Sequence, residues 1–276
     1  MMTHCPIHRH MLQQQHLPHA HPDDHQGLDE FDIEHFWQCC LQDYPALRQV
    51  KLGEVPVEDG EIWKFSPGTF MVPRDVGDRP TVLFGAMNAE VWTHMKRTRE
   101  ASLRLTAQRI GIPYASLTPR LLHAFILFHE LGHAYDFLTR FAKGAHTPAV
   151  YFRAGRAWRK QSGYESSLQP IPGMSPGLLE VNIADGTLLK IFNDNPVIRE
   201  RLRMRGVDSV DDPASLERLR RIVNDSYKQG RMEQNADAFA ANAMRRYASH
   251  LLPAQATVAP AISVGGVRED ALNILA

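Results

Sequence analysis

The sequence predicts an α+β fold in which a small mixed sheet packs on a long apolar helix. Between Val50 and Gly85, short apolar runs are broken by Gly and Pro, which is typical of strands. Apolar residues at helical spacing come before and after this region. The runs expected to form strands are KLGEVPV, EIWKF, GTFMVP and TVLFG.

A helix is expected on each side of the strand region. Residues 28–47 place their apolar side chains on one helix face, with Pro45 near the end. Residues 88–110 return to helical spacing, and Gly111 and Pro113 close that segment.

Length and composition suit one large domain or two small ones, and we expect one folded domain between two tails. The 276 residues, 43% of them hydrophobic, are enough for a large core. Residues 1–27 contain seven histidines and few core formers, so we expect a disordered tail; a metal-scavenging tail is the alternative. The domain is expected to span 28–253, followed by a tail at 254–276. Within the domain, about 141–230 forms a long insertion, with a Gly-, Pro- and Ser-rich loop at 161–177 and helices after it. This insertion could act as a lid, or it could only elaborate the structure.

Charge and hydropathy narrow the classes of partner. Lys plus Arg and Asp plus Glu both number 31, so no overall field favours nucleic acid or an anionic membrane. Arginines at 199–205 are interleaved with Glu200 and are expected to be solvated. The apolar runs are far shorter than the roughly 20 residues of a membrane span, no signal-peptide pattern is present, and the cysteines lack CxxC spacing. We therefore expect a soluble, cytoplasmic protein without nucleic-acid or membrane partners, and leave its oligomeric state open.

The apolar segment LLHAFILFHELGHAYDFLTR, residues 121–140, carries two histidines four positions apart. Thr118 can cap a helix that begins with Pro119, so this segment is expected to be helical. On a helix, residues i and i+4 lie on the same face, and His129 and His133 can therefore bind one metal ion. Two core histidines are the alternative reading.

Glu130 lies about 100° round the helix from His129, so it borders the expected site without being an ideal ligand. It can instead deprotonate a water at the metal. Gly132 would allow close approach of a neighbouring element.

A third ligand is expected from the segment RMEQNADAFAANAMRRYASHLLP. A catalytic zinc site has three protein ligands and an open position. Glu233 would bind the metal, and Asp237, four residues later, would hydrogen bond to a ligating histidine. The neighbouring alanines would let this helix approach the first; they are Ala236, Ala240 and Ala243. The rival third ligands are Asp136, His146, Glu165 and Glu180. Asp136 could instead pair with Arg140, and His146 and Glu165 are expected in loops.

The two motifs resemble those of a known class of enzymes. HELGHA followed by EQNADAFAA resembles the gluzincin metallopeptidases, whose pattern is HExxH with a later glutamate. The second stretch is most similar to the ExxAxxFA signature of the ImmA/IrrE family, with some similarity to Ste24/HtpX-type peptidases. The resemblance implies a zincin-like fold and one zinc per chain, held by His129, His133 and Glu233, with Glu130 as general base. About 100 residues separate the motifs, longer than the spacing of ImmA/IrrE proteins.

The expected function is zinc-dependent hydrolysis of peptide bonds, by an endopeptidase rather than an exopeptidase, acting on a protein or peptide. A non-enzymatic regulatory or binding module with a structural zinc is the alternative, and hydrolysis of a non-peptide amide is a third reading. Tyr151 and Tyr164 are candidate donors to the developing oxyanion, whereas Tyr247 is too far from Glu233. The edge of the TVLFG strand is expected to hold the substrate.

Overall fold

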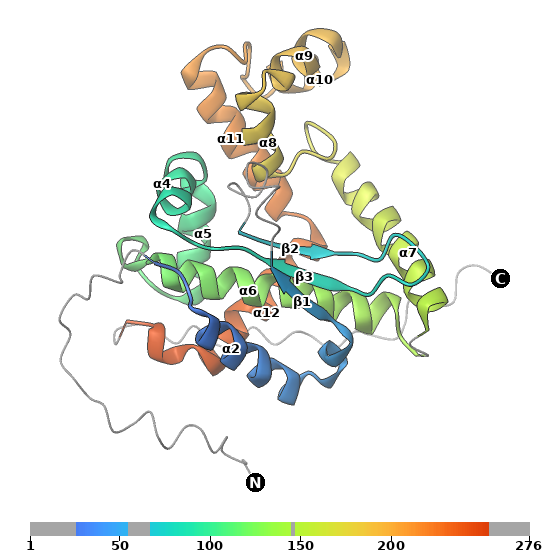
Figure 1. Ribbon diagram of the computed structural model, residues 1–276. Helices are drawn as coiled ribbons and strands as arrows, with labels where there is room; N and C mark the ends of the chain where they lie inside the picture. The colour runs from blue at the N-terminus through green and yellow to red at the C-terminus, as the bar shows by residue number, and fades with distance from the viewer. Residues whose placement is uncertain (1–25, 55–66, 145–146, 254–276) are drawn as a thin grey trace.

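The computed structural model describes residues 26–54, 67–144 and 147–253, which are mostly helical around one small sheet (Figure 1). Helix α6 (Pro119–Asp136) runs along the sheet in the middle of the fold, and α12 (Arg231–Tyr247) packs against it. The remaining α-helices are α2 (Glu30–Asp43), α4 (Ala89–Thr98), α5 (Glu100–Ile110), α7 (Pro148–Ser167), α8 (Pro176–Ala184), α9 (Thr187–Asp194), α10 (Pro196–Arg203) and α11 (Pro213–Lys228).

The described sheet has three strands in the order β1, β3, β2. The central strand, β3 (Thr81–Phe84), is parallel to β1 (Lys51–Glu54) and antiparallel to β2 (Gly68–Met71). The predicted small mixed sheet is therefore confirmed, while the expected strand EIWKF lies outside the described residues. The expectation that TVLFG offers a free edge is wrong, because β3 is paired on both sides; β2 is an edge strand of the described sheet.

Helix α6 begins as its sequence predicts and is buried along most of its length. The Thr118 side chain accepts a hydrogen bond from the Leu121 N–H, and Pro119 occupies the first turn. After Asp136 the chain continues as one π-helical segment, Phe137–Phe141. Neither α6 nor another helix in the described ranges is long and apolar enough to cross a membrane.

The close contact between α6 and α12 depends on small residues. A Cβ added to Gly132 would lie 2.9 Å from Ala236 Cα and 3.0 Å from Phe239 Cβ. Ala236 and Ala240 are fully buried at the same interface region. A larger residue at position 132 would force the two helices apart.

The segment 88–110 forms two helices, not the single helix that its spacing predicts. Helix α4 ends at Thr98 and α5 starts at Glu100, because Arg99 leaves the helical region with φ −132° and ψ 28°. The Thr98 hydroxyl donates to the His94 carbonyl, a local bond that accompanies the end of the helix. Gly111 then closes α5 in a left-handed conformation, as expected.

The expected loop at 161–177 is also corrected. Helix α7 continues to Ser167, so only the later part of this stretch is irregular before α8 begins. Thr147 caps α7, and the helix buries one face through Tyr151, Ala154, Gly155 and Trp158. The buried face holds the helix in place despite the small polar residues that follow it.

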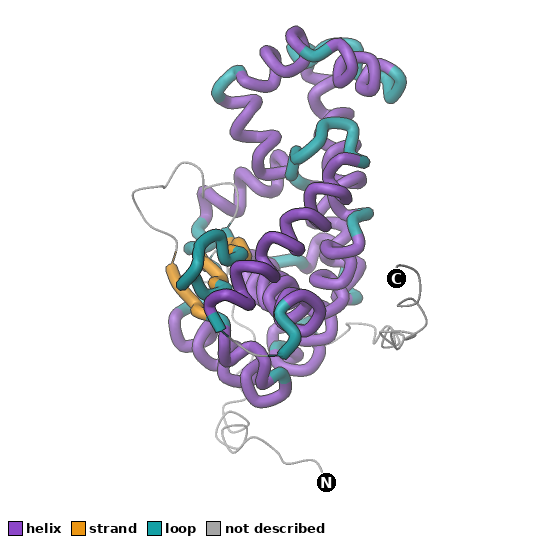
Figure 2. The backbone as a smooth tube through the Cα atoms, turned by 90° about the vertical axis from the view of Figure 1, so that its right-hand side faces the viewer, coloured by secondary structure: helices purple, strands orange, loops and turns teal. Residues whose placement is uncertain are grey.

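The helices α8 to α11 surround a second, smaller core. In Figures 1 and 2 these helices extend away from the sheet at the top of the molecule. Their apolar side chains pack mainly on one another, while the larger core surrounds α6. The buried residues of the smaller core are Ile171, Met174, Leu179, Leu188, Phe192, Leu202, Val207, Val210, Leu219 and Val223.

Candidate metal centre

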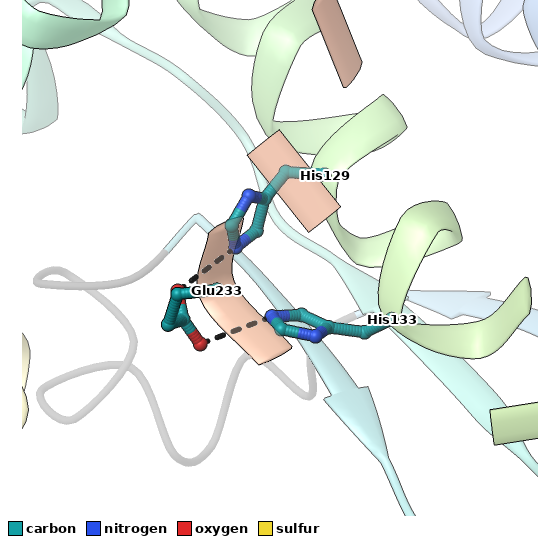
Figure 3. A group of neighbouring side chains, drawn as sticks. All are labelled: His129, His133 and Glu233. Carbon is teal, nitrogen blue, oxygen red and sulfur yellow. Dashed lines mark ion pairs between the residues drawn. The ribbon is translucent and has the colours of Figure 1, made fainter. Parts of the chain in front are cut away.

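Two imidazoles from α6 and one carboxylate from α12 meet in the interior of the fold (Figure 3). His129 and His133 lie on the same face of α6 because four residues are close to one helical turn. Glu233, in the first turn of α12, places Oε2 3.3 Å from His129 Nε2 and Oε1 3.2 Å from His133 Nε2. One ligand atom from each residue lies within 4.8 Å of the other two. The three side chains could therefore hold a metal ion.

The separations between these atoms are of the size expected for ligands of one metal ion. Ligand atoms about 2.0 to 2.1 Å from a tetrahedral centre are about 3.3 to 3.4 Å from one another. The two imidazole–carboxylate separations, 3.3 and 3.2 Å, each to a different oxygen of Glu233, are close to this value. His129, His133 and Glu233 are only 8%, 8% and 9% exposed, so most of each side chain is buried.

Asp237 supports the cluster from behind. Its Oδ1 lies 2.7 Å from His129 Nδ1, which leaves Nε2 of that ring facing Glu233. Lys228 Nζ lies 3.0 Å from the same oxygen, and Arg109 Nε lies 3.2 Å from Oδ2. Burial would raise the pKa of Asp237, but the hydrogen bond with His129 and the charges of Lys228 and Arg109 lower it to about 2.

The groups in the cluster favour a positive charge at its centre. Burial and the charge of Lys228 act to lower the pKa of His129, yet hydrogen bonds with Asp237 and Glu233 raise it to about 9. Burial acts to raise the pKa of Glu233, but His133 and His129 hold it well below its usual value. A divalent ion would supply this positive charge in place of the proton on the His129 imidazole.

Glu130 lies beside the three ligand atoms without joining them. Its side chain is partly exposed and faces the open space next to the cluster. Strand β2 passes close by, since a Cβ added to Gly68 would lie 3.2 Å from Glu130 Cγ and 2.6 Å from Ile126 Cγ2. The carboxylate is therefore placed between the cluster and the edge strand.

Two cavities flank the cluster, and we name them by the helices that line them. The α7-side cavity has a volume of about 370 Å³ and extends along β2 to Trp158. The α5-side cavity, about 330 Å³, is lined by apolar side chains including Leu103, Phe125 and Val181. Residues that line both cavities are Gly68, Thr69, Glu130, Ser175, Tyr227 and Glu233. The cavities are thus neighbours on either side of one centre.

Tyr227, at the end of α11, is a site residue that the sequence reasoning missed. It lines both cavities, and its side chain hydrogen bonds to Glu233. Burial, together with the charges of Glu233 and Glu130, raises its pKa well above the usual value, so the hydroxyl keeps its proton. Its position six residues before Glu233, across a helix junction, is the signal that could have found it.

The structure does not bring the two expected tyrosines to the cluster. The Tyr151 hydroxyl donates a hydrogen bond to Gln49, and its side chain is buried in the core. Tyr164 is 63% exposed on α7. Neither residue lines the two cavities.

Three of the rival third ligands are described and do not belong to the three-residue cluster, and the fourth lies outside the described residues. Asp136 accepts two hydrogen bonds of 2.9 Å from Arg140, the pairing that its spacing suggests. Glu165 lies in α7, not in a loop, and accepts a bond from the Met232 N–H, whereas Glu180 binds Arg220. His146 is not among the described residues.

A scan against protein-family models, a search of the curated proteins and a search of the solved structures found no match to this chain. The resemblance to gluzincins therefore depends on the two motifs.

Proposed function

We propose that this chain is a zinc-dependent metallopeptidase with a zincin-like catalytic core. The observation that carries the proposal is the meeting of His129, His133 and Glu233, with the carboxylate of Glu130 beside them in open space. This division between three ligands and one adjacent, non-ligating acid is what hydrolysis at a metal requires. Asp237 contacts the far nitrogen of His129 and so supports the ligands without closing the site.

Zinc is the proposed metal because two imidazoles and one carboxylate form a ligand set suited to it rather than to magnesium or calcium. When bound, zinc supplies Lewis acidity, which activates water and polarises a carbonyl group. One ion per chain is proposed at this centre.

Glu130 is the proposed general base. Its carboxylate lies next to His129 in the chain and lines both cavities, so it can reach a water and a peptide at the centre. It would take a proton from the attacking water and deliver it to the leaving amine. Tyr227 would donate its hydroxyl proton in a hydrogen bond to the developing oxyanion, because its raised pKa keeps that proton in place.

Strand β2 is the proposed support for the substrate. Gly68 and Thr69 of this strand line both cavities, so its edge runs past the centre. An extended peptide can add to such an edge through backbone hydrogen bonds. Space on both sides of the centre supports cleavage within a chain, which favours an endopeptidase.

Cleavage of a peptide library by the wild type and by Glu130→Gln tests the proposal. We expect the wild type to cleave, and Glu130→Gln to lose activity by a factor of about 10² to 10⁴ while keeping its zinc. Glu34→Gln, an exposed change on α2, is the control and should cleave as the wild type does. No cleavage by the zinc-loaded wild type, with unfolding on zinc removal, would instead support a non-enzymatic module with a structural zinc.

A further inference from the structure

Arg99 places a positive charge in the wall of the α5-side cavity. It occupies the junction between α4 and α5, where the chain leaves the helical conformation. Its side chain lines this cavity together with Glu130 and Tyr227. A guanidinium is thus built into the space beside the proposed reaction centre.

Two donors of this guanidinium lack an acceptor. Arg99 Nε and Nη2 are buried and have no hydrogen-bond partner within 26–54, 67–144 and 147–253. Burial lowers the pKa of Arg99 to about 10, so the group keeps its charge at neutral pH. Burying charged donors without an acceptor costs free energy, and turning the guanidinium toward an acceptor in the cavity would recover it.

Glu180, whose charge acts to raise the pKa of Arg99, is already bound to another arginine. Its carboxylate accepts bonds of 2.9 and 3.1 Å from Arg220. Lys228, the other cation of this cavity, lies 3.0 Å from Asp237. Arg99 is therefore the cation of this wall with unused donors.

The rest of the cavity suits an aliphatic stem. The apolar side chains that line it are Met95, Leu103, Leu122, Phe125, Ile126, Leu178 and Val181. A ligand that combines an apolar stem with a terminal anion would match these walls and Arg99 together. Arginine binds carboxylates well because its planar fork can donate two parallel hydrogen bonds.

We propose that Arg99 binds a carboxylate of the peptide substrate, and that the α5-side cavity is the subsite for the residue carrying it. The proposal rests on the peptidase function proposed above. Two sources offer the same chemistry: the side chain of an aspartate or glutamate, and the free C-terminus of a short peptide. Either would make the enzyme select substrates by a negative charge next to the cleaved bond.

Peptide binding to the full-length, zinc-loaded Glu130→Gln variant tests this assignment without cleavage. The probes are hexapeptide pools with glutamate or glutamine at each position, each made with a free or an amidated C-terminus. Each carboxylate is compared with its amide: glutamate with glutamine, and the free C-terminus with the amidated one. In one of these two comparisons, we expect the peptide with the carboxylate to bind about tenfold or more tightly. Discrimination by the side-chain pair or by the terminal pair identifies the source. Equal affinities in all pairs, or no binding by any pool, would overturn the proposal.

Substitutions in the same background connect the preference to Arg99. Arg99→Gln should abolish the discrimination between carboxylate and amide, and Arg99→Lys, which keeps the charge but not the fork, should reduce it. Arg97→Gln is the matched control, since it removes an exposed arginine two residues away that does not line this cavity. Full discrimination in Arg99→Gln would refute the role of Arg99. If an Arg99 variant fails to fold, the comparison of peptide pairs in Glu130→Gln, which keeps Arg99, still tests the proposal.

Cleavage assays separate this proposal from the peptidase function. Binding that prefers carboxylates, with no cleavage by the zinc-loaded protein carrying Glu130, would contradict the peptidase function and leave the subsite standing. Cleavage by that protein, without a carboxylate preference in binding, would support the peptidase function and contradict the subsite.

Discussion

His129 Nδ1 and Asp237 Oδ1 lie 2.7 Å apart, although 108 positions separate the two residues in the chain. The contact fixes which nitrogen of His129 faces Glu233, and it connects the ligand on α6 to the helix that supplies the third ligand. Asp237 also neutralises Lys228 and Arg109, which would otherwise place unpaired positive charge behind the metal centre.

Asp237→Asn should therefore weaken zinc binding by about 10- to 100-fold. Asparagine keeps the size of the side chain but loses the charge that orients and polarises the imidazole. Competition with a chromophoric chelator measures the affinity, and Asp225→Asn, an exposed change on α11, is the control. Wild-type affinity in Asp237→Asn would show that the contact does not support the metal.

Gly132→Ala should reduce the free energy of unfolding by about 1 to 3 kcal/mol, because the new methyl group would meet Ala236 and Phe239. Helix propensity alone would favour alanine by about 1 kcal/mol, so a loss identifies the packing effect. Gly163→Ala on α7 is the matched control: a Cβ there meets nothing within 4 Å, and stability should rise by about 0.4 to 1 kcal/mol. Denaturant unfolding measures both. Equal stabilisation of the two variants would contradict the close approach of α6 and α12.

Tyr227→Phe should lower kcat by about 10²-fold while the protein retains its zinc. The change removes only the hydroxyl that is proposed to stabilise the oxyanion. Tyr164→Phe, at an exposed position away from both cavities, should have wild-type kinetics. Steady-state cleavage and zinc analysis of the same samples distinguish a role in binding Glu233 from a role as oxyanion donor. Loss of zinc in Tyr227→Phe would make its bond to Glu233 the important contact. An unchanged kcat would exclude the donor role.

His123 should make the fold sensitive to acid. Its Nδ1 accepts a hydrogen bond from the Leu28 N–H and its Nε2 lies 2.8 Å from the Gly85 carbonyl, so a second ring proton would face a donor. Burial, opposed by the bond to Gly85, lowers its pKa from 6.5 to about 4. A folded-state pKa below the unfolded value means that stability is present above pH 6.5 and is lost as the pH falls through 4.

Between pH 7 and pH 4 this residue should account for a loss of about 2 to 3 kcal/mol in the free energy of unfolding. Denaturant titrations at both values, on the wild type and His123→Gln, measure the effect. The variant should be less stable at pH 7 but should show a shallower pH dependence. Identical pH slopes would rule out His123 as the source.

Local signals in the sequence predicted the elements that carry the candidate ligands. Thr118 and Pro119 mark the start of α6, and the spacing of His129 and His133 determines a shared helix face. Small residues around Gly132 predicted a close helix contact, which the structure contains. These features depend on neighbouring residues along one helix, so the sequence alone was sufficient.

Features that depend on distant parts of the chain were harder to predict. The order of the strands, which places β3 in the middle and β2 at an edge, depends on pairing that no single strand encodes. Tyr227 enters the site because α11 ends beside α12, and Glu165 is helical because α7 buries a face that includes Trp158. The break between α4 and α5 was not predicted, because the apolar spacing continues through Arg99 while only the backbone of that residue leaves the helical region.

The most direct test of the central claim is the zinc content, after dialysis against a weak chelator, of the protein without residues 1–25, because the seven histidines of that segment could bind zinc themselves. We predict that the wild type retains about one tightly bound zinc per chain, that His133→Asn and Glu233→Gln lose it, and that Glu130→Gln and Asp136→Asn keep it. Failure of the wild type to retain zinc even after zinc is added, or full retention in Glu233→Gln, would contradict a metal centre formed by His129, His133 and Glu233.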